Sequence, residues 1–136
     1  MKLLVAGSRH FKFSTLFIQG LIQSIYGPQL PKSTISEIIS GGAKGIDWLG
    51  RQFSGSQGIN YREFGAEWDK HGKAAGPIRN KQMAEYSDEL LLIWDGKSKG
   101  SANMKQEMLK LNKPVIEVVI TTYNLQEDPE EFGHYK

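Results

Sequence analysis

Hydrophobic residues along this chain alternate between short uninterrupted runs and stretches with helical periodicity. The apolar runs predict strands near residues 2–6, 35–40, 59–64, 89–94 and 114–120. The periodic stretches predict helices near residues 14–26, 44–56, 77–86 and 101–112. Strands joined by helices pair in parallel through right-handed crossovers, and strands without polar alternation are covered by helices on both faces. We therefore predict an α/β fold, a single three-layer Rossmann-like domain with a mainly parallel sheet of about five strands.

The regular alternation ends near residue 121. Residues 122–136 are acidic, contain Pro129 and show neither the strand period nor the helix period. We expect a domain at 1–121 and a separate acidic tail at 122–136, which either frays or packs on a neighbouring surface.

Three of the predicted strands run into turns rich in glycine and hydroxyl groups. The first strand is followed by Gly7-Ser8-Arg9, the second by the sequence SGGAKGID at 40–47, and the fourth by DGKSKGS at 95–101. Each turn opens a predicted helix, so backbone amides and the positive helix end face the same rim of the sheet. Ligands of such sheets bind at the carboxyl ends of the strands, near the point where the strand order reverses. The pattern predicts a phosphate-binding rim.

The first turn has side chains suited to an anion. Gly7 permits close backbone approach, Ser8 offers a hydroxyl, and Arg9 can hold an anion through two parallel hydrogen bonds. A histidine at position 10 can act as an acid or a base, but a single histidine beside Phe11 also fits a packed or exposed spectator.

The second turn is the most specific of the three. Its paired glycines let the backbone fold over a ligand, and Asp47 falls in the first turn of the next helix. That carboxylate can cap backbone amides or accept a ribose hydroxyl. The spacing matches neither the P-loop nor the Gly-x-Gly-x-x-Gly pattern of dinucleotide oxidoreductases.

A long segment separates the third strand from the next helix. Within it, Trp68 predicts order and either stacks on a base or anchors the loop. Gly76 before Pro77 indicates a helix entry. Arg79 and Asn80 then lie in the first helical turn, within reach of the rim.

Composition narrows the classes of function. Of the 136 residues, 39% are hydrophobic and 24% are charged. A chain of this length and composition can form a hydrophobic core without disulfides or a structural metal. With no cysteine, disulfide scaffolds, zinc ribbons and thiol nucleophiles are excluded. No apolar run reaches the ~18 residues of a membrane span, and the chain enters its first strand without a signal-peptide pattern. We expect a soluble cytoplasmic protein that needs no membrane, metal or cofactor.

The net charge of +2 conceals an asymmetry. Residues 124–136 hold four acidic side chains and one lysine, which leaves 16 basic and 11 acidic residues, a net charge of +5, on the rest of the chain. Several basic residues fall in or near the glycine turns: Arg9, Lys12, Lys44, Lys97 and Lys99. This distribution suits an anionic ligand, although a solvated basic face has the same composition.

Together these motifs resemble the YspA-like (cpYpsA-related) branch of the SLOG superfamily, which also contains the Lonely Guy phosphoribohydrolases and the DNA-processing protein DprA. The resemblance rests on Gly7-Ser8-Arg9, SGGAKGID at 40–47, Trp68 with GKAAGPIRN at 72–80 and Met83, and WDGKSKGS at 94–101, and it covers residues 2–119. It implies a Rossmann-like sheet that binds a nucleotide-derived ligand, for which ADP-ribose-type molecules have been proposed in several branches.

One position departs from the enzymes of this superfamily. Lonely Guy enzymes cleave the bond between base and ribose phosphate with an arginine, which Arg79 matches, and a glutamate, whose position here is Met104. A methionine can neither stabilise an oxocarbenium-like centre nor activate water. The remaining carboxylates that can replace it near the rim are Asp47, Glu67, Asp69, Asp95 and Glu107.

The leading hypothesis is therefore a module that senses or sequesters a nucleotide-derived small molecule. An N-glycosidase with Arg79 and Asp47 as catalytic residues is the alternative, and DprA-like binding of single-stranded DNA is a second alternative, which the modest net charge disfavours. The apolar positions Leu16, Phe17, Leu21 and Ile25 belong either to the core or to a homodimer contact. The predicted ligand-binding residues are Gly7, Ser8, Arg9, Ser40, Gly41, Gly42, Ala43, Gly45, Asp47, Trp68, Arg79, Asn80, Asp95, Ser98, Gly100 and Ser101.

Overall fold

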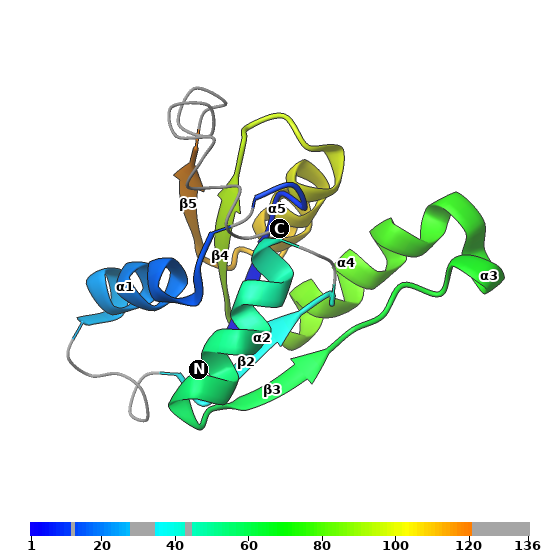
Figure 1. Cartoon of the computed structure of the whole chain (residues 1–136). Helices are drawn as coiled ribbons and strands as arrows, with labels where there is room; N and C mark the ends of the chain where they lie inside the picture. The colour runs from blue at the N-terminus through cyan, green and yellow to red at the C-terminus, as the bar shows by residue number, and fades with distance from the viewer. Residues whose placement is uncertain (12, 28–34, 43–44, 121–136) are drawn as a thin grey trace.

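The structure is a parallel sheet of five strands covered by helices on both faces (Figure 1). The computed structural model describes residues 1–11, 13–27, 35–42 and 45–120. The elements follow in the order β1 (Lys2–Gly7), α1 (Thr15–Tyr26), β2 (Glu37–Ser40), α2 (Ile46–Gln57), β3 (Asn60–Glu63), α3 (Trp68–His71), η2 (Gly72–Ala74), α4 (Ala75–Tyr86), β4 (Glu89–Trp94), α5 (Lys99–Lys110) and β5 (Val115–Val119). The predicted acidic tail, together with Lys12, Ala43 and Lys44, lies outside the described residues.

The strands lie in the order β3-β2-β1-β4-β5, and every neighbouring pair is parallel. The chain first moves from β1 toward β3 and then returns to place β4 on the other side of β1. The order therefore reverses between β1 and β4, which is the crevice where open α/β sheets bind ligands. The predicted α/β, Rossmann-like fold is confirmed.

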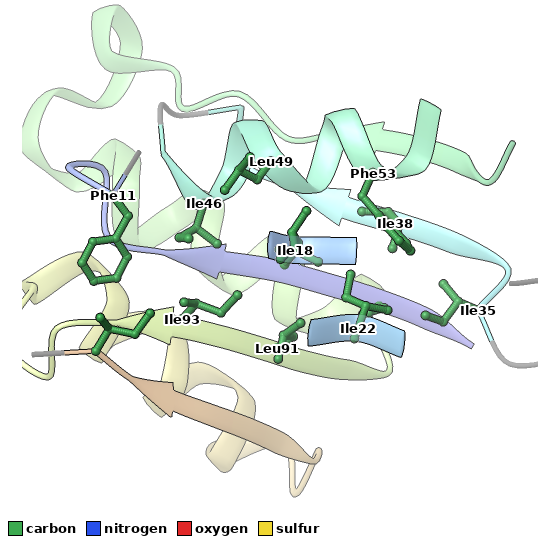
Figure 2. Packing of buried hydrophobic residues seen from close by; sticks show 13 residues of the cluster. Phe11, Ile18, Ile22, Ile35, Ile38, Ile46, Leu49, Phe53, Leu91 and Ile93 are labelled. Atoms are coloured by element: carbon green, nitrogen blue, oxygen red, sulfur yellow. The ribbon is translucent and has the colours of Figure 1, made fainter. Parts of the chain in front are cut away.

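Alternate residues of the central strands enter two separate cores. Leu3 and Val5 of β1 face the layer of α1 and α2, whereas Leu4 and Ala6 face the layer of α4 and α5. In the first core, shown in Figure 2, the helices supply apolar residues at helical spacing, which are Ile18 and Ile22 from α1 and Ile46, Leu49 and Phe53 from α2. The second core contains Met83, Met104 and Met108. This two-sided burial explains why the strands lack polar alternation.

The apolar face of α1 is divided between the core and solvent. Phe17, Leu21 and Ile25 pack against the first core, whereas Leu16 is 76% exposed. Most of this stripe therefore belongs to the core, and association into a homodimer remains a prediction. No helix in the described part of the chain combines the length and apolarity needed to cross a membrane.

Candidate functional site

A cavity of about 680 Å³ opens at the carboxyl ends of β1, β2 and β4. Its volume is typical of small-molecule sites. The walls come from the turn after β1, the turn after β2, the first turn of α5, and the segment that leads into α4. The lining residues are Ala6, Gly7, Ser8, Arg9, His10, Gly41, Gly42, Asp47, Ala66, Trp68, Gly76, Pro77, Arg79, Asn80, Met83, Ser98, Lys99, Gly100, Ser101, Asn103 and Met104. The predicted rim of glycine turns is thus one wall of a cavity.

The end of β1 is fixed against β4 by a glycine. A Cβ atom at Gly7 would lie 1.8 Å from the carbonyl oxygen of Ile93, so no other residue fits at this contact. The next residue, Ser8, is buried, and its amide donates to the same carbonyl at 3.1 Å. Arg9 and His10 follow at the exposed mouth of the cavity.

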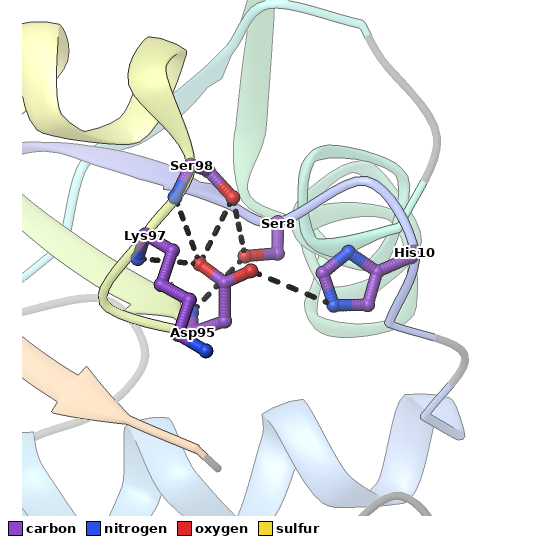
Figure 3. Close-up of polar contacts among 5 residues, drawn as sticks. All are labelled: Ser8, His10, Asp95, Lys97 and Ser98. Atoms are coloured by element: carbon purple, nitrogen blue, oxygen red, sulfur yellow. Dashed lines mark hydrogen bonds and ion pairs between the residues drawn. The ribbon is translucent and has the colours of Figure 1, made fainter. Parts of the chain in front are cut away.

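The turn between β4 and α5 is organised by Asp95, as Figure 3 shows. Its Oδ1 atom accepts from the amide of Lys97 at 2.8 Å, the amide of Ser98 at 2.9 Å and the hydroxyl of Ser98 at 3.0 Å. His10 Nε2 lies 3.8 Å from Oδ2. Burial alone would raise the pKa of Asp95, but these three hydrogen bonds and the nearby His10 outweigh burial and lower it to about 2. Asp95 is therefore ionised and braces the turn, and it does not line the cavity.

The two serine hydroxyls at this corner belong to a closed ring of hydrogen bonds. Asp95 N donates to Ser8 Oγ at 3.1 Å, and the two Oγ atoms of Ser8 and Ser98 lie 3.2 Å apart. Because a hydroxyl carries one proton and Ser98 gives its proton to Asp95, Ser8 is the donor in the contact between them. Neither hydroxyl has a proton left for a ligand. The donors that remain in the cavity wall are therefore backbone amides, basic side chains and the hydroxyl of Ser101.

Such amides lie at the start of α5. The first hydrogen bond of the helix runs from Ala102 N to Ser98 O at 3.0 Å, so the amides of Lys99, Gly100 and Ser101 precede any intrahelical acceptor. These three residues line the cavity. The helix starts at Lys99, two residues before the predicted boundary. The start of α5 thus presents open amide donors and the positive end of its dipole to the cavity.

The turn after β2 is held by a chain of hydrogen bonds behind the cavity wall. Gly42 N donates to Ser40 Oγ at 3.3 Å, Ser40 Oγ lies 2.5 Å from the Tyr61 hydroxyl, and Tyr61 donates to Glu63 at 2.8 Å. Burial raises the pKa of Tyr61, the Ser40 hydrogen bond opposes this change, and Glu63 raises it further, to about 12. Tyr61 therefore remains protonated, and fully buried Ser40 is a brace that does not line the cavity.

Arg79 and Asp47 meet at Gly41. Arg79 Nη1 donates to Gly41 O at 3.3 Å, while Arg79 Nε is buried with no hydrogen-bond partner in the described structure. A Cβ atom at Gly41 would lie 2.7 Å from Arg79 Nη1 and 3.0 Å from Asp47 Oδ2, so both side chains flank the same point. Asp47 is the second residue of α2 and is buried. The two predicted catalytic residues therefore lie on one wall of the cavity.

Asn80 joins the helix that carries Arg79 to the start of α5. It is buried, and its Nδ2 donates to Gly100 O at 3.2 Å and to Asn103 Oδ1 at 2.9 Å. Both protons of this amide are therefore used between the two helices. Asn80 sets the position of Arg79 relative to the α5 amides.

Trp68 forms the outer rim of the cavity. It begins α3, a helical turn that the sequence did not predict, and its side chain is 57% exposed. A Cβ atom at Gly76, the second residue of α4, would lie 3.5 Å from the indole Cη2. The ring thus rests beside the first turn of α4. The helix begins at Ala75, so the expected entry after Gly76 is wrong by two residues, whereas Pro77 does fall in the first turn.

The carboxylates proposed to replace the glutamate of Lonely Guy enzymes lie in different places. Met104 is buried at the cavity wall, and Glu107, one turn further along α5, pairs with Lys110 at 3.2 Å. Glu67 and Asp69 are exposed beside Trp68 and do not line the cavity. Among the described residues, Asp47 is the carboxylate in the cavity wall.

Most predicted site residues therefore come together. Ser40, Gly45 and Asp95 support the turns without lining the cavity, and Ala43 lies outside the described residues. Gly45 has a φ of 76°, and a Cβ there would lie 2.6 Å from Ser8 O, so it lets α2 start against the first turn. Asn103 was missed, although it follows Gly100 by three residues and so shares its helix face.

Within the described ranges, no group of three histidines or carboxylates could hold a metal.

Comparison with known proteins identifies a similar phage protein, whose name states no activity. No family model matches the chain. The chain is similar to the Gene 61 protein of Mycobacterium phage D29, with 28% identity over 121 residues that span 85% of this chain and 94% of that protein.

Proposed function

We propose that this protein binds a nucleotide-derived anion, such as an ADP-ribose-like molecule, in the cavity at the carboxyl ends of β1, β2 and β4. The observation that carries the proposal is Arg79, whose Nε is buried without a hydrogen-bond partner in the described structure. A buried donor left unpaired costs about 1–3 kcal/mol, and more when it is charged. A bound phosphate or similar anion would remove that cost.

The charges around the cavity support an anionic ligand. The described lining residues include three basic side chains, Arg9, Arg79 and Lys99, and one carboxylate, Asp47. The amides at the start of α5 add the positive end of a helix dipole. Since the Ser8 and Ser98 hydroxyls have already given their protons away, the donors left for the anion are these amides, the basic side chains and the hydroxyl of Ser101.

The nucleotide character of the ligand rests on two further arguments. The buried carboxylate of Asp47 accepts hydrogen bonds, as the hydroxyls of a ribose would require, and it would repel a phosphate placed directly beside it. The resemblance to YspA-like SLOG domains points to the same class of molecule. The protein would then act as a sensor or as a sequestering module.

A second function is favoured by the meeting of Asp47 and Arg79 at Gly41. An N-glycosidase needs a carboxylate near the anomeric carbon and a cation for the phosphate, and these two side chains could fill those roles. Met104 removes the carboxylate that the Lonely Guy enzymes use. Binding without cleavage is therefore the preferred proposal.

A thermal-shift screen tests both functions. The purified chain is heated with AMP, ADP-ribose, cyclic ADP-ribose isomers, NAD and cyclic dinucleotides, and each stabilising compound is recovered by chromatography after long incubation. A nucleotide that raises the melting temperature and returns intact supports binding. Release of free base supports the glycosidase, and a melting temperature unchanged by every compound contradicts both.

A further inference from the structure

The cavity has two chemically different ends. At one end Asn80 of α4 donates to Gly100 O, beside the amides of α5 and Lys99, which suit an anion. One turn earlier along α4, Gly76 lies beside Trp68, and there the wall of Ala66, Trp68, Gly76 and Pro77 carries no charge. An anion and an apolar group of the same ligand would therefore separate along the cavity.

The uncharged end is not a second anion site. Ala75 N, at the start of α4, already donates to Gly72 O, and Pro77 has no amide proton to offer. The first turn of α4 thus has fewer open amide donors than the start of α5. What this end presents to a ligand is the indole of Trp68.

Exposure and a place in the cavity wall together distinguish Trp68 from the other tryptophans. Trp94 is 7% exposed, and its Nε1 donates to Glu117 at 2.7 Å. Trp48 is 50% exposed on α2 and does not line the cavity. Of the large apolar side chains that are exposed in the described part of the chain, Trp68 alone lines the cavity. A half-exposed indole beside a small-molecule cavity is a surface on which a flat aromatic ring can stack.

We infer that the ligand lies across the cavity with its phosphate at the start of α5 and an aromatic base stacked on Trp68. This inference rests on the proposed function and adds an orientation and a ligand class to it. The ribose between the two ends then passes the Asp47 carboxylate, while the neighbouring guanidinium of Arg79 faces the phosphate. Affinity is divided accordingly, because Arg79 and the α5 amides recognise the phosphate and Trp68 recognises the base.

Ligands with and without a base test the inference by isothermal titration calorimetry. ADP-ribose and AMP carry adenine, whereas ribose 5-phosphate has the phosphate and sugar alone. Base stacking predicts that AMP binds about tenfold or more tightly than ribose 5-phosphate. Trp68→Ala should remove most of that difference while leaving the affinity for ribose 5-phosphate unchanged, and Trp68→Phe should retain it.

Trp48→Ala is the matched control, because it removes a similarly exposed indole outside the cavity and should alter neither affinity. If Trp68→Ala weakens AMP and ribose 5-phosphate equally, or weakens neither, the stacked base is excluded while phosphate binding stands. If ADP-ribose, AMP and ribose 5-phosphate all fail to bind the wild-type chain, the proposed function and this inference fall together.

Discussion

Individual polar residues around the cavity divide into those with groups open to the cavity and those that hold its wall. Ser8, Ser98 and Asp95 form a closed hydrogen-bond ring, and Ser40 is tied to Tyr61. The residue types alone do not separate the two roles, since a serine in a turn suits either. Only the partner of each hydroxyl shows that its proton is already engaged.

The ionised carboxylate of Asp95 makes the free energy of unfolding depend on pH. Its pKa falls from an ordinary 3.8 to about 2, so its contribution is present above pH 3.8 and is lost as the pH falls toward 2. Asp95→Asn should therefore lower the free energy of unfolding at pH 7 by on the order of 1–2 kcal/mol. Urea denaturation at pH 7 and at steps from pH 4 to pH 2 measures the difference between variant and wild type.

That difference should shrink across the acid window, because the protonated aspartic acid also lacks the charge. Asp69→Asn serves as the control, since Asp69 is exposed on α3, and it should leave stability at pH 7 unchanged. A gap between Asp95→Asn and wild type that stays constant down to pH 2 would contradict the assigned role of Asp95.

At the scale of elements, packing against β1 decides which glycine of helix α2 can be replaced by a larger residue. Helix α2 contains Gly50 and Gly55, five residues apart. A Cβ atom at Gly50 would lie 3.0 Å from Cβ of Val5, whereas a Cβ atom at Gly55 would meet nothing within 4 Å. Gly50 therefore sets the distance between α2 and β1, and Gly55 only weakens the helix.

These two positions give opposite predictions for the same substitution. Gly55→Ala should raise the free energy of unfolding by about 0.5–1 kcal/mol, because alanine has the better helix propensity and has room. Gly50→Ala should lower it, because Val5 and the strand beneath it must shift. Chemical denaturation of both variants measures the effect, and a shift of the same sign in both would refute the packing argument.

Most regular elements could be predicted because they carry a buried face. Helix α1 and strands β1, β2 and β4 have buried apolar residues at the expected period, whereas β3 has none and was indicated by the partly buried Ile59, Tyr61 and Phe64. The boundaries of α1 and the five strands differ from the prediction by at most two residues. The segment that forms α3 and η2 has no buried residues and therefore no hydrophobic period to detect. The early start of α4 was hidden because Gly76 indicates a boundary, yet here it lies inside the helix against Trp68.

For the whole molecule, topology explains why distant motifs share one site. Parallel pairing brings the turns after β1, β2 and β4 to one edge, and this much of the site followed from the sequence. The meeting of Arg79 with Gly41 could not be predicted, because it depends on how α4 packs against the rest of the fold. The same holds for Asn103, whose place in the wall is set by its hydrogen bond to Asn80.

The central claim, that a nucleotide-derived anion binds at Arg79, is tested most directly by calorimetric titration of ADP-ribose into wild type, Arg79→Ala and Arg79→Lys. Arg51→Ala, which changes an exposed arginine on α2 outside the cavity, is the control, and circular dichroism checks that each variant is folded. The account predicts that Arg79→Ala weakens binding about tenfold or more, that Arg79→Lys falls between Arg79→Ala and wild type, and that Arg51→Ala binds as wild type does. Equal affinity of Arg79→Ala and wild type, or no binding of ADP-ribose to wild type, would contradict it.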